Sequence, residues 1–337
     1  MKTIAEVLKL SSGFLSERGL ERARRCAEEL LGSVVGLKRL ELYMQFDRPV
    51  LERELVALRS LLKRAATQEP LEYILGSVEF AGCTIALAPS VLIPRPETEI
   101  LVSLVVKKLE GKSLEGKVLW DVCSGSGCIG IALKKAFPAL RVVLSDCSPD
   151  ALRLAEQNAK TNGVAVEFEM GDLLERFHGA SADIVVCNPP YLSTNEYLNA
   201  QHSVRAFEPK LALVGGEKGT EFYERLAREL PGCLRTPALV ALEIGWNQGA
   251  AVQAIFEPFA GAIPRAVTNC TFEGDSSDPA AKDRGEVDIF NITPRPDPSQ
   301  MGHCNPFKSA ICDRSRYTKR LEKDWAGKDR FFFLEIE

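Results

Sequence analysis

Apolar residues in the first part of the chain recur at intervals of three and four. In residues 1–70 these positions form one stripe per segment, and charged residues occupy the positions between them. This spacing is typical of amphipathic helices. We therefore expect a small domain of four or five helices over 1–70. The stripe comprises Ile4, Val7, Leu8, Leu20, Ala23, Ala27, Leu30, Leu31, Leu51, Leu55, Leu58 and Leu62.

Residues 71–93 change character and are expected to form a linker β-hairpin. Short β-favouring runs flank Gly76 and Gly82, and glycine between such runs is typical of a tight turn. A helix should follow, because Pro96 suits a first helical turn and Glu97 and Glu99 suit the positive end of the helix dipole.

From residue 117 onward, apolar runs of strand length alternate with helical patterns. This alternation predicts a mostly parallel sheet with helices on both faces, an α/β Rossmann-like domain over 94–337. Residues from about 271 to 318 do not fit it, since they are rich in Asp, Pro, Ser, Lys and Arg, and we expect a mobile surface insertion there. The predicted strands are 117–122, 141–146, 164–169, 182–187, 239–244 and 330–336, and the predicted helices are 128–136, 149–162 and 217–230.

A glycine-rich turn after the first predicted strand of the sheet is the candidate cofactor site. The run Cys123-Ser124-Gly125-Ser126-Gly127 lies at the carboxyl end of that strand, where open α/β sheets bind ligands. The glycines allow the backbone to approach a ligand closely. With Gly130, the spacing also matches the dinucleotide motif Gly-x-Gly-x-x-Gly, so this turn alone leaves both cofactor classes open.

Three acids, Asp121, Asp146 and Asp172, are predicted to lie at successive strand ends. Asp146 is placed to accept hydrogen bonds from ribose hydroxyls, a feature that dinucleotide and adenosylmethionine enzymes share. An acid in the run Gly171-Asp172-Leu173 can reach the adenine amino group. The three acids together favour an adenosine-containing cofactor.

The run Asn188-Pro189-Pro190-Tyr191 follows a predicted buried strand and is the candidate reaction site. Each proline holds the residue before it in an extended conformation, so no helix consumes the carbonyl oxygens of Asn188 and Pro189. Together with the Asn188 side-chain oxygen, these are acceptors in fixed directions. Tyr191 can stack on a flat guest group.

Such acceptors match the two N–H donors of a planar amide or amine. They would aim its nitrogen at the sulfonium methyl group of S-adenosylmethionine and favour positive charge that grows on nitrogen. The predicted reaction is therefore methylation of a planar nitrogen. The motif by itself does not choose between glutamine, adenine and cytosine.

Composition changes this picture only slightly. The formal net charge of -4 and the pI near 5.7 argue against a nucleic-acid substrate, since no basic face is evident. The 10 cysteines are scattered without a Cys-x-x-Cys pair, which predicts free thiols in a reducing cytoplasm and no metal site. No apolar run in the sequence approaches the ~18 residues of a membrane span, so we expect a cytoplasmic protein without a membrane partner.

These motifs together resemble the bacterial protein-(glutamine-N5) methyltransferases of peptide chain release factors, often called PrmC or HemK. The likeness extends over nearly all of the chain outside the expected insertion. It rests on the runs Glu69–Gly76, Glu79–Phe80, Val91–Glu99, Asp121–Gly127 and Asn188–Tyr191, and further on Glu208–Pro209, Leu211–Leu213, Gly215–Gly216, Glu243–Gly245, Gln248 and Asp324–Arg330.

The resemblance implies a class I methyltransferase fold and a helical N-terminal domain that helps to hold a release factor. It implies S-adenosylmethionine as cofactor, contacted by Cys123–Gly127, Asp146 and Leu173, and the glutamine of a Gly-Gly-Gln loop as target, held by Asn188–Tyr191. Related enzymes methylate a ribosomal-protein glutamine, but Pro94–Thr98 favours the release-factor branch. The alternatives are an amino-methyltransferase of DNA or RNA bases, a non-catalytic module that binds adenosylmethionine, and a dinucleotide oxidoreductase.

Overall fold

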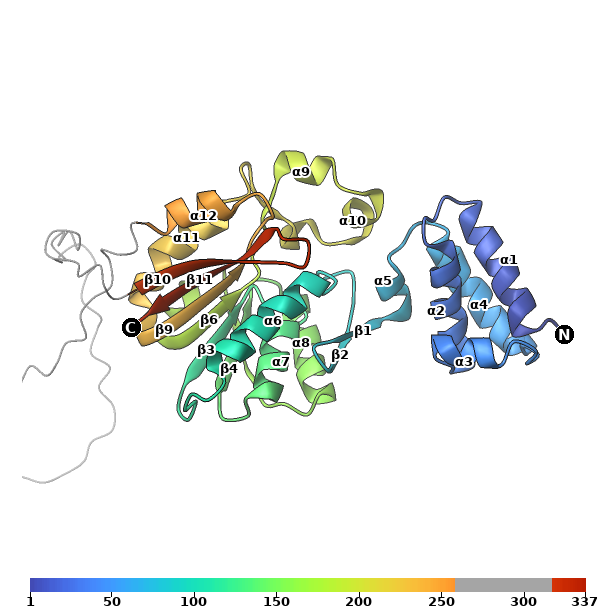
Figure 1. Ribbon diagram of the computed structural model, residues 1–337, viewed down its shortest axis with the longest axis horizontal. Helices are drawn as coiled ribbons and strands as arrows, with labels where there is room; N and C mark the ends of the chain where they lie inside the picture. The colour runs from blue at the N-terminus through green and yellow to red at the C-terminus, as the bar shows by residue number, and fades with distance from the viewer. Residues whose placement is uncertain (258–316) are drawn as a thin grey trace, which may run out of the picture.

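Helices form the first part of the chain in the computed structural model, which describes residues 1–257 and 317–337 (Figure 1). The first helix begins after Thr3, whose hydroxyl accepts a hydrogen bond from the Glu6 backbone while the Glu6 carboxylate accepts one from the Thr3 backbone. This reciprocal cap satisfies two donors that a helix start leaves open. The helices are α1 (Ile4–Ser16), α2 (Ala23–Val35), α3 (Arg39–Met44), α4 (Glu52–Ala65) and α5 (Leu71–Leu75).

The predicted apolar stripes pack into a hydrophobic core that belongs to these helices. Leu51 is the exception, because it lies at the cap position before α4 and its side chain is 38% exposed. Ile74 of α5 also packs in this core. We propose that the helical domain nevertheless ends near residue 70 as predicted and that α5 begins the linker, because Tyr73 of α5 packs in a core of the sheet domain. In Figure 1 the helices lie at one end of the molecule, joined to the sheet by α5 and a hairpin.

The predicted hairpin forms around Gly82. Strands β1 (Ser77–Phe80) and β2 (Cys83–Ala86) pair antiparallel, with Phe80 opposite Cys83. The expectation of β-structure from residue 71 was wrong for its first residues, which form α5. Pro70 precedes that single turn, and Gly76 ends it with a φ of 79°. A glycine in the left-handed region is a common helix terminator.

In the described residues, seven strands form one sheet in the order β10-β11-β9-β6-β3-β4-β5. The five strands from β9 to β5 pair in parallel, whereas β11 runs antiparallel to both β9 and β10. The predicted parallel sheet is thus confirmed, with an antiparallel edge. The bounds are β3 (Val118–Val122), β4 (Arg141–Asp146), β5 (Glu167–Met170), β6 (Ala182–Cys187), β9 (Leu234–Glu243), β10 (Tyr317–Lys323) and β11 (Asp329–Ile336).

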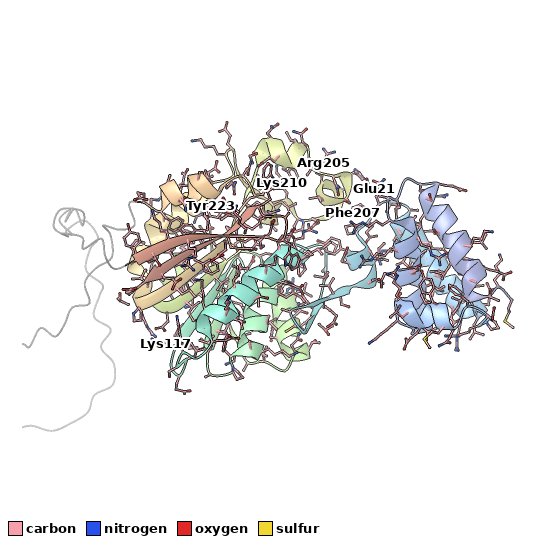
Figure 2. All side chains as sticks on the ribbon, in the orientation of Figure 1. Glu21, Lys117, Arg205, Phe207, Lys210 and Tyr223 are labelled. Atoms are coloured by element: carbon pink, nitrogen blue, oxygen red, sulfur yellow. The ribbon has the colours of Figure 1, made fainter. Side chains whose placement is uncertain are left out.

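Helices cover both faces of this sheet, because alternate side chains of the buried strands enter two separate cores. Phe331 and Phe333 pack with Leu101 of one helical layer, while Phe332 packs with Tyr223 of the other. Tyr223 is labelled in Figure 2. Burial on both faces explains the continuous apolar runs of these strands. The first layer contains α6 (Pro96–Leu109), α7 (Cys128–Ala136) and α8 (Pro149–Thr161), and the second contains α11 (Glu221–Glu229) and α12 (Gly249–Ile255).

A long excursion from the sheet, which begins after β6, comes before α11 in the chain. Strand β7 pairs in parallel with β8, where Leu192 lies opposite Val214. Figure 2 labels Arg205, Phe207 and Lys210 in this excursion. Its elements are β7 (Leu192–Ser193), α9 (Thr194–Leu198), α10 (His202–Phe207), the 3-10 turn η2 (Lys210–Ala212) and β8 (Val214–Gly216); η1 (Glu175–Phe177) and η3 (Leu230–Gly232) lie elsewhere.

The insertion expected at about 271–318 lies outside the described residues, except that Tyr317 and Thr318 belong to β10. Within the described ranges, the helices are too short or too polar to cross a bilayer.

Candidate functional site

A cavity of about 520 Å³ opens at the carboxyl ends of β3, β4, β5 and β6. This volume falls within the roughly 300–1,000 Å³ of small-molecule sites. Its position is the one that the strand order predicts for a ligand of an open α/β sheet. Nine of the predicted site residues line it: Cys123, Ser124, Gly125, Ser126, Asp146, Asp172, Leu173, Asn188 and Pro190. Gly127, Pro189 and Tyr191 are not among the lining residues.

The two glycines of the turn have different physical roles. Gly125 lines the cavity with a φ of +54°, and a Cβ added there would meet no atom within 4 Å. Gly127 precedes α7 with a φ of +78°, and an added Cβ would lie 3.0 Å from the Ala155 side chain and 3.1 Å from that of Leu144. Gly125 thus leaves the cavity wall open, while Gly127 lets α7 approach β4 and α8 closely.

Asp121 stabilises the helix start that follows this turn and is not among the residues that line the cavity. It is fully buried, and its Oδ2 accepts a hydrogen bond of 2.8 Å from the backbone nitrogen of Gly130. Burial raises the pKa of Asp121 to about 7, since the charged form loses its hydration. Asp121 therefore positions the start of α7, whereas Asp146 and Asp172 face the cavity.

The Asp146 carboxylate lies at the end of β4 and is tied to the glycine turn. Its Oδ2 accepts from the Gly125 backbone at 2.8 Å, and its Oδ1 accepts from the Ser148 backbone at 2.9 Å. Burial raises the pKa of this carboxyl group, and the backbone donors of Ser148, Gly125 and Cys147 oppose that shift. A carboxylate has about four acceptor sites, so these donors do not exhaust it. Asp146 can therefore accept further hydrogen bonds from a polar guest in the cavity.

Asp172 forms an ion pair with Arg225 of α11 at 2.9 Å, and both residues line the cavity. The neighbouring Leu173 is buried and has a φ of 50°. Sequence reasoning did not identify Arg225, because nothing in the spacing of the α11 residues marks it as a partner of an acid 53 positions earlier.

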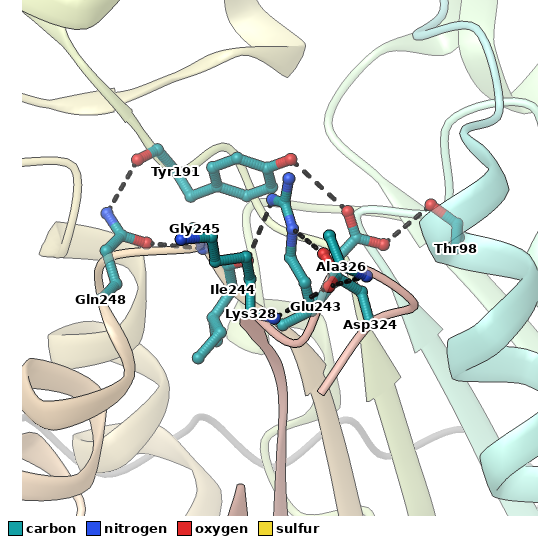
Figure 3. Close-up of polar contacts among 10 residues, drawn as sticks. Thr98, Tyr191, Glu243, Ile244, Gly245, Gln248, Asp324, Ala326 and Lys328 are labelled. Atoms are coloured by element: carbon teal, nitrogen blue, oxygen red, sulfur yellow. Dashed lines mark hydrogen bonds and ion pairs between the residues drawn. The ribbon is translucent and has the colours of Figure 1, made fainter. Parts of the chain in front are cut away.

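The predicted clamp, defined as residues 188–191, leads from β6 into the excursion. Pro189 and Pro190 are buried, and Asn188 is partly exposed to the cavity. Within the described ranges, the backbone hydrogen bonds do not end on the carbonyl oxygens of Asn188 and Pro189. At the far end of the clamp, the Tyr191 carbonyl accepts a hydrogen bond of 2.9 Å from Gln248 Nε2. Gln248 Oε1 in turn accepts a hydrogen bond from the Gly245 backbone (Figure 3).

Two buried polar side chains hold the clamp from behind, and sequence reasoning gave neither a role. The Tyr191 hydroxyl donates to Glu243 Oε1 at 3.4 Å, and the Thr98 hydroxyl donates to Glu243 Oε2 at 2.7 Å (Figure 3). Burial raises the pKa of Tyr191 and raises the pKa of Glu243 to about 7. Both positions carried a signal in the sequence, since Thr98 lies three residues before Leu101, in line with the apolar stripe of α6, and Glu243 ends the apolar run of β9.

In the described ranges, the acidic, cysteine and histidine side chains form no group of three or more that could hold a metal ion. The seven cysteines that the structure describes have free thiols, as predicted.

Comparisons with known proteins identify both parts of the chain. The model of the PrmC N-terminal domain matches residues 6–76, and that of the methyltransferase small domain matches residues 96–208. A release factor glutamine methyltransferase of Geobacter sulfurreducens is 39% identical over 254 residues, which cover 75% of this chain and 88% of that protein.

Two further relatives carry the same name. The protein of Chlamydia trachomatis serovar L2 is 41% identical over 251 residues, covering 74% of this chain and 85% of the relative. The protein of Bacillus subtilis is 39% identical over 267 residues, covering 78% of this chain and 92% of the relative. With this similarity and a sheet of the predicted topology, the class I methyltransferase fold is confirmed, and the chain belongs to the family of release factor glutamine methyltransferases.

Proposed function

We propose that this enzyme uses S-adenosylmethionine to methylate the side-chain amide nitrogen of the glutamine in the Gly-Gly-Gln motif of peptide chain release factors. The observation that carries the proposal is the position of Asn188, which closes β6 and lines the same cavity as the glycine turn. A planar nitrogen held by the clamp would therefore meet a cofactor bound at the turn. Membership of the family supports the release factor as the partner.

The residues of the cavity fit S-adenosylmethionine. When bound, it supplies a methyl group on a positively charged sulfur. The open wall at Gly125 leaves space for an adenosyl group, and the remaining lone pairs of Asp146 can accept from both ribose hydroxyls. Leu173 offers an apolar contact for the adenine, and Asp172 can accept from its amino group while it keeps its ion pair with Arg225.

The clamp residues would hold the target amide and stabilise its charge. Asn188 Oδ1 and the Pro189 carbonyl are acceptors for the two hydrogens of the glutamine NH2 group. An amide nitrogen is a poor nucleophile, because its lone pair is shared with the carbonyl. Acceptors that bind more strongly as nitrogen becomes positive lower the barrier for transfer, and fixed alignment contributes further. Tyr191, anchored at both its hydroxyl and its carbonyl, keeps the clamp in place.

Two other substrate classes share this chemistry. An adenine or cytosine amino group would also satisfy the clamp, but the acidic balance of the chain does not favour a nucleic-acid substrate. A ribosomal-protein glutamine would satisfy it too, and the run Pro94–Thr98 favours the release factor instead. The proposed activity places the enzyme in the cytoplasm, where its substrate acts in translation.

Transfer of a tritiated methyl group tests the release factor and its loop glutamine against a DNA substrate. Purified enzyme is incubated with labelled S-adenosylmethionine and one of three acceptors: a release factor, the same factor with its loop glutamine replaced by alanine, or bulk DNA. We expect label on the intact factor alone. Label on DNA, or equal label on the factor without its glutamine, would overturn the proposal.

A further inference from the structure

We propose that Glu243 and Thr98 are positioning residues that determine which atom of the Asn188 amide faces the target. This inference rests on the proposed function and deepens it. The two side chains and Asn188 form a hydrogen-bonded relay, defined as Glu243–Thr98–Asn188, that connects β9, α6 and the clamp. Glu243 is not among the residues that line the cavity, and Thr98 lines it but is only 2% exposed, so both act on the target through Asn188.

The relay is buried and continuous. Thr98 is 2% exposed and Glu243 is 1% exposed. The Thr98 hydroxyl donates to Glu243 Oε2 at 2.7 Å, and Asn188 Nδ2 donates to the same hydroxyl oxygen at 3.4 Å. The longer second bond is the one nearest the cavity, at the residue that is partly exposed there.

The direction of the first bond determines the direction of the second. A threonine hydroxyl has one hydrogen, and here that hydrogen points to a carboxylate oxygen. The hydroxyl can then offer Asn188 only a lone pair. Only the amide nitrogen of Asn188 can meet a lone pair, so Nδ2 turns toward Thr98 and Oδ1 is left for a guest in the cavity.

This orientation matters because the two ends of an asparagine amide have nearly the same shape but opposite hydrogen-bonding character. Oδ1 accepts from the NH2 group of a target glutamine, whereas Nδ2 in the same place would oppose it donor to donor. Without the relay, steric fit alone would not separate the two orientations. The acceptor needed for charge that grows on the target nitrogen would then be absent for part of the time.

The same carboxylate also holds the other end of the clamp. Glu243 Oε1 accepts from the Tyr191 hydroxyl at 3.4 Å, while Oε2 accepts from Thr98. A residue that only filled this place could be apolar, as are the neighbouring Leu242 and Ile244. A buried carboxylate instead lowers the stability of the folded protein. The cost is consistent with a role in orienting the clamp.

Two substitutions at Thr98 test the relay. Thr98→Val keeps the shape of the side chain and removes the hydroxyl, while Thr98→Ser keeps the hydroxyl. The control is Ser103→Ala on the same helix, since the exposed Ser103 hydroxyl bonds, within the part of the chain that the structure describes, only to the Glu99 carbonyl of that helix. For each variant, kcat and KM for a release factor, the Kd for S-adenosylmethionine and the midpoint of thermal unfolding are measured.

We expect Thr98→Val to lower kcat by about 10- to 100-fold, with little change in cofactor Kd, and Thr98→Ser and Ser103→Ala to stay near wild type. A Thr98→Val enzyme with near-normal kcat would overturn the relay alone. Equal losses in Thr98→Val and Thr98→Ser would also overturn it, because serine keeps the hydroxyl that the relay needs and the losses would then come from disturbed packing. A wild-type enzyme that leaves the release factor unlabelled would overturn the proposed function and the relay together.

Should Thr98→Val be unfolded at the assay temperature, Glu243→Gln gives the second test. A glutamine amide can both donate to and accept from Thr98, so the relay loses its fixed direction while the side chain keeps its shape. The expected result is a fall in kcat at unchanged cofactor Kd. An unchanged kcat would overturn the inference.

Discussion

Arg95 and Glu208 form an ion pair of 2.5 Å between the segment that enters α6 and the segment that follows α10. The Glu208 side chain is 2% exposed and that of Arg95 is 33% exposed. Glu208 Oε2 also accepts from the Ile93 backbone at 3.4 Å. The pair joins two stretches that border the cavity, since Pro94 and Pro209 both line it.

Breaking this pair from one side should destabilise the protein. Arg95→Met leaves the Glu208 carboxylate buried without its cation, and we expect a loss of about 2–3 kcal/mol in the free energy of unfolding by urea. This is below the ~3–5 kcal/mol of a fully buried pair, because Arg95 is partly solvated. The double variant Arg95→Met with Glu208→Gln should recover most of the loss. Additive losses in the double-mutant cycle would show that the two residues are not coupled.

The two turn glycines should differ in what their substitution changes. Gly127→Ala brings both a positive φ and contacts of 3.0–3.1 Å, so we expect it to lower the free energy of unfolding by about 1–3 kcal/mol more than Gly125→Ala. Gly125→Ala should instead weaken S-adenosylmethionine binding more, because its methyl group enters the cavity wall. Unfolding curves and calorimetric titrations of both variants measure the two rankings. The same ranking in both measurements would contradict this division of roles.

Much of the frame was predictable because strand and helix periods are local properties. Helix α7 has the bounds 128–136 that were predicted for it, and strand β6 has the predicted bounds 182–187. Strand β10 was not predicted. All seven of its residues are partly or fully exposed, and it begins at Tyr317, next to a polar stretch without periodicity. An edge strand of this kind owes its place to β11, which no local pattern in β10 reveals.

The part of the candidate site that lines the cavity was also predictable, because glycine turns and strand-end acids occupy a known edge of a parallel sheet. The supporting residues were not. Thr98 and Glu243 are 145 positions apart, and each is visible in the sequence only as a polar residue in line with apolar positions of its own element. Such a residue predicts a buried partner without saying which one. Their pairing depends on α6 packing against β9, a tertiary contact.

Loss of the Asn188 side chain should separate catalysis from cofactor binding. We expect Asn188→Ala to abolish methyl transfer to a release factor, because the acceptor for the target amide is gone, while the Kd for S-adenosylmethionine changes little. Asn195→Ala is the matched control, since Asn195 is exposed on α9 and, among the described residues, its side chain bonds only to Asn199. Near-normal turnover in Asn188→Ala would contradict the clamp.

The Glu243→Gln variant should gain stability relative to wild type as the pH rises. Burial raises the pKa of Glu243 from 4.5 to about 7 in the folded protein. Its contribution to stability is therefore present below about pH 4 and is lost as the pH rises to 7, because the folded state then holds a buried charge. Glutamine does not titrate, so the variant should be more stable than wild type by up to about 3 kcal/mol at pH 8.

Urea unfolding of both proteins at intervals from pH 4.5 to 8 measures this difference. Asp121, whose pKa is also raised to about 7, titrates in both proteins and cancels in the comparison. A stability difference that does not change over this range would show that Glu243 ionises normally. The expected result, a more stable but less active variant at pH 8, is the pattern of a residue kept for function at the expense of stability.

The pH dependence of kcat should reveal the protonation state of Glu243. Residues of five elements interact with the Glu243 carboxyl group, by hydrogen bonds or through their charges. They are Thr98 and Glu97 of α6, Tyr191 of the clamp, Tyr223 of α11, Cys128 of α7 and Arg330 of β11. Arg330 lowers its pKa and Glu97 raises it. When protonated, Glu243 can donate to Thr98, which is then free to donate to Asn188 and draw its oxygen away from the target. We therefore expect the wild-type kcat, measured at saturating S-adenosylmethionine, to fall below about pH 7.

Thr98→Val should remove this acid limb, because its side chain cannot carry the change at Glu243 to Asn188. The variant keeps Asp121, the other buried carboxyl group of the site whose pKa lies near 7. If the limb persists in Thr98→Val with the same midpoint, the titrating group lies outside the relay and Asp121 becomes the first candidate. If the limb disappears and kcat stays uniformly low, Glu243 controls turnover through the hydroxyl of Thr98.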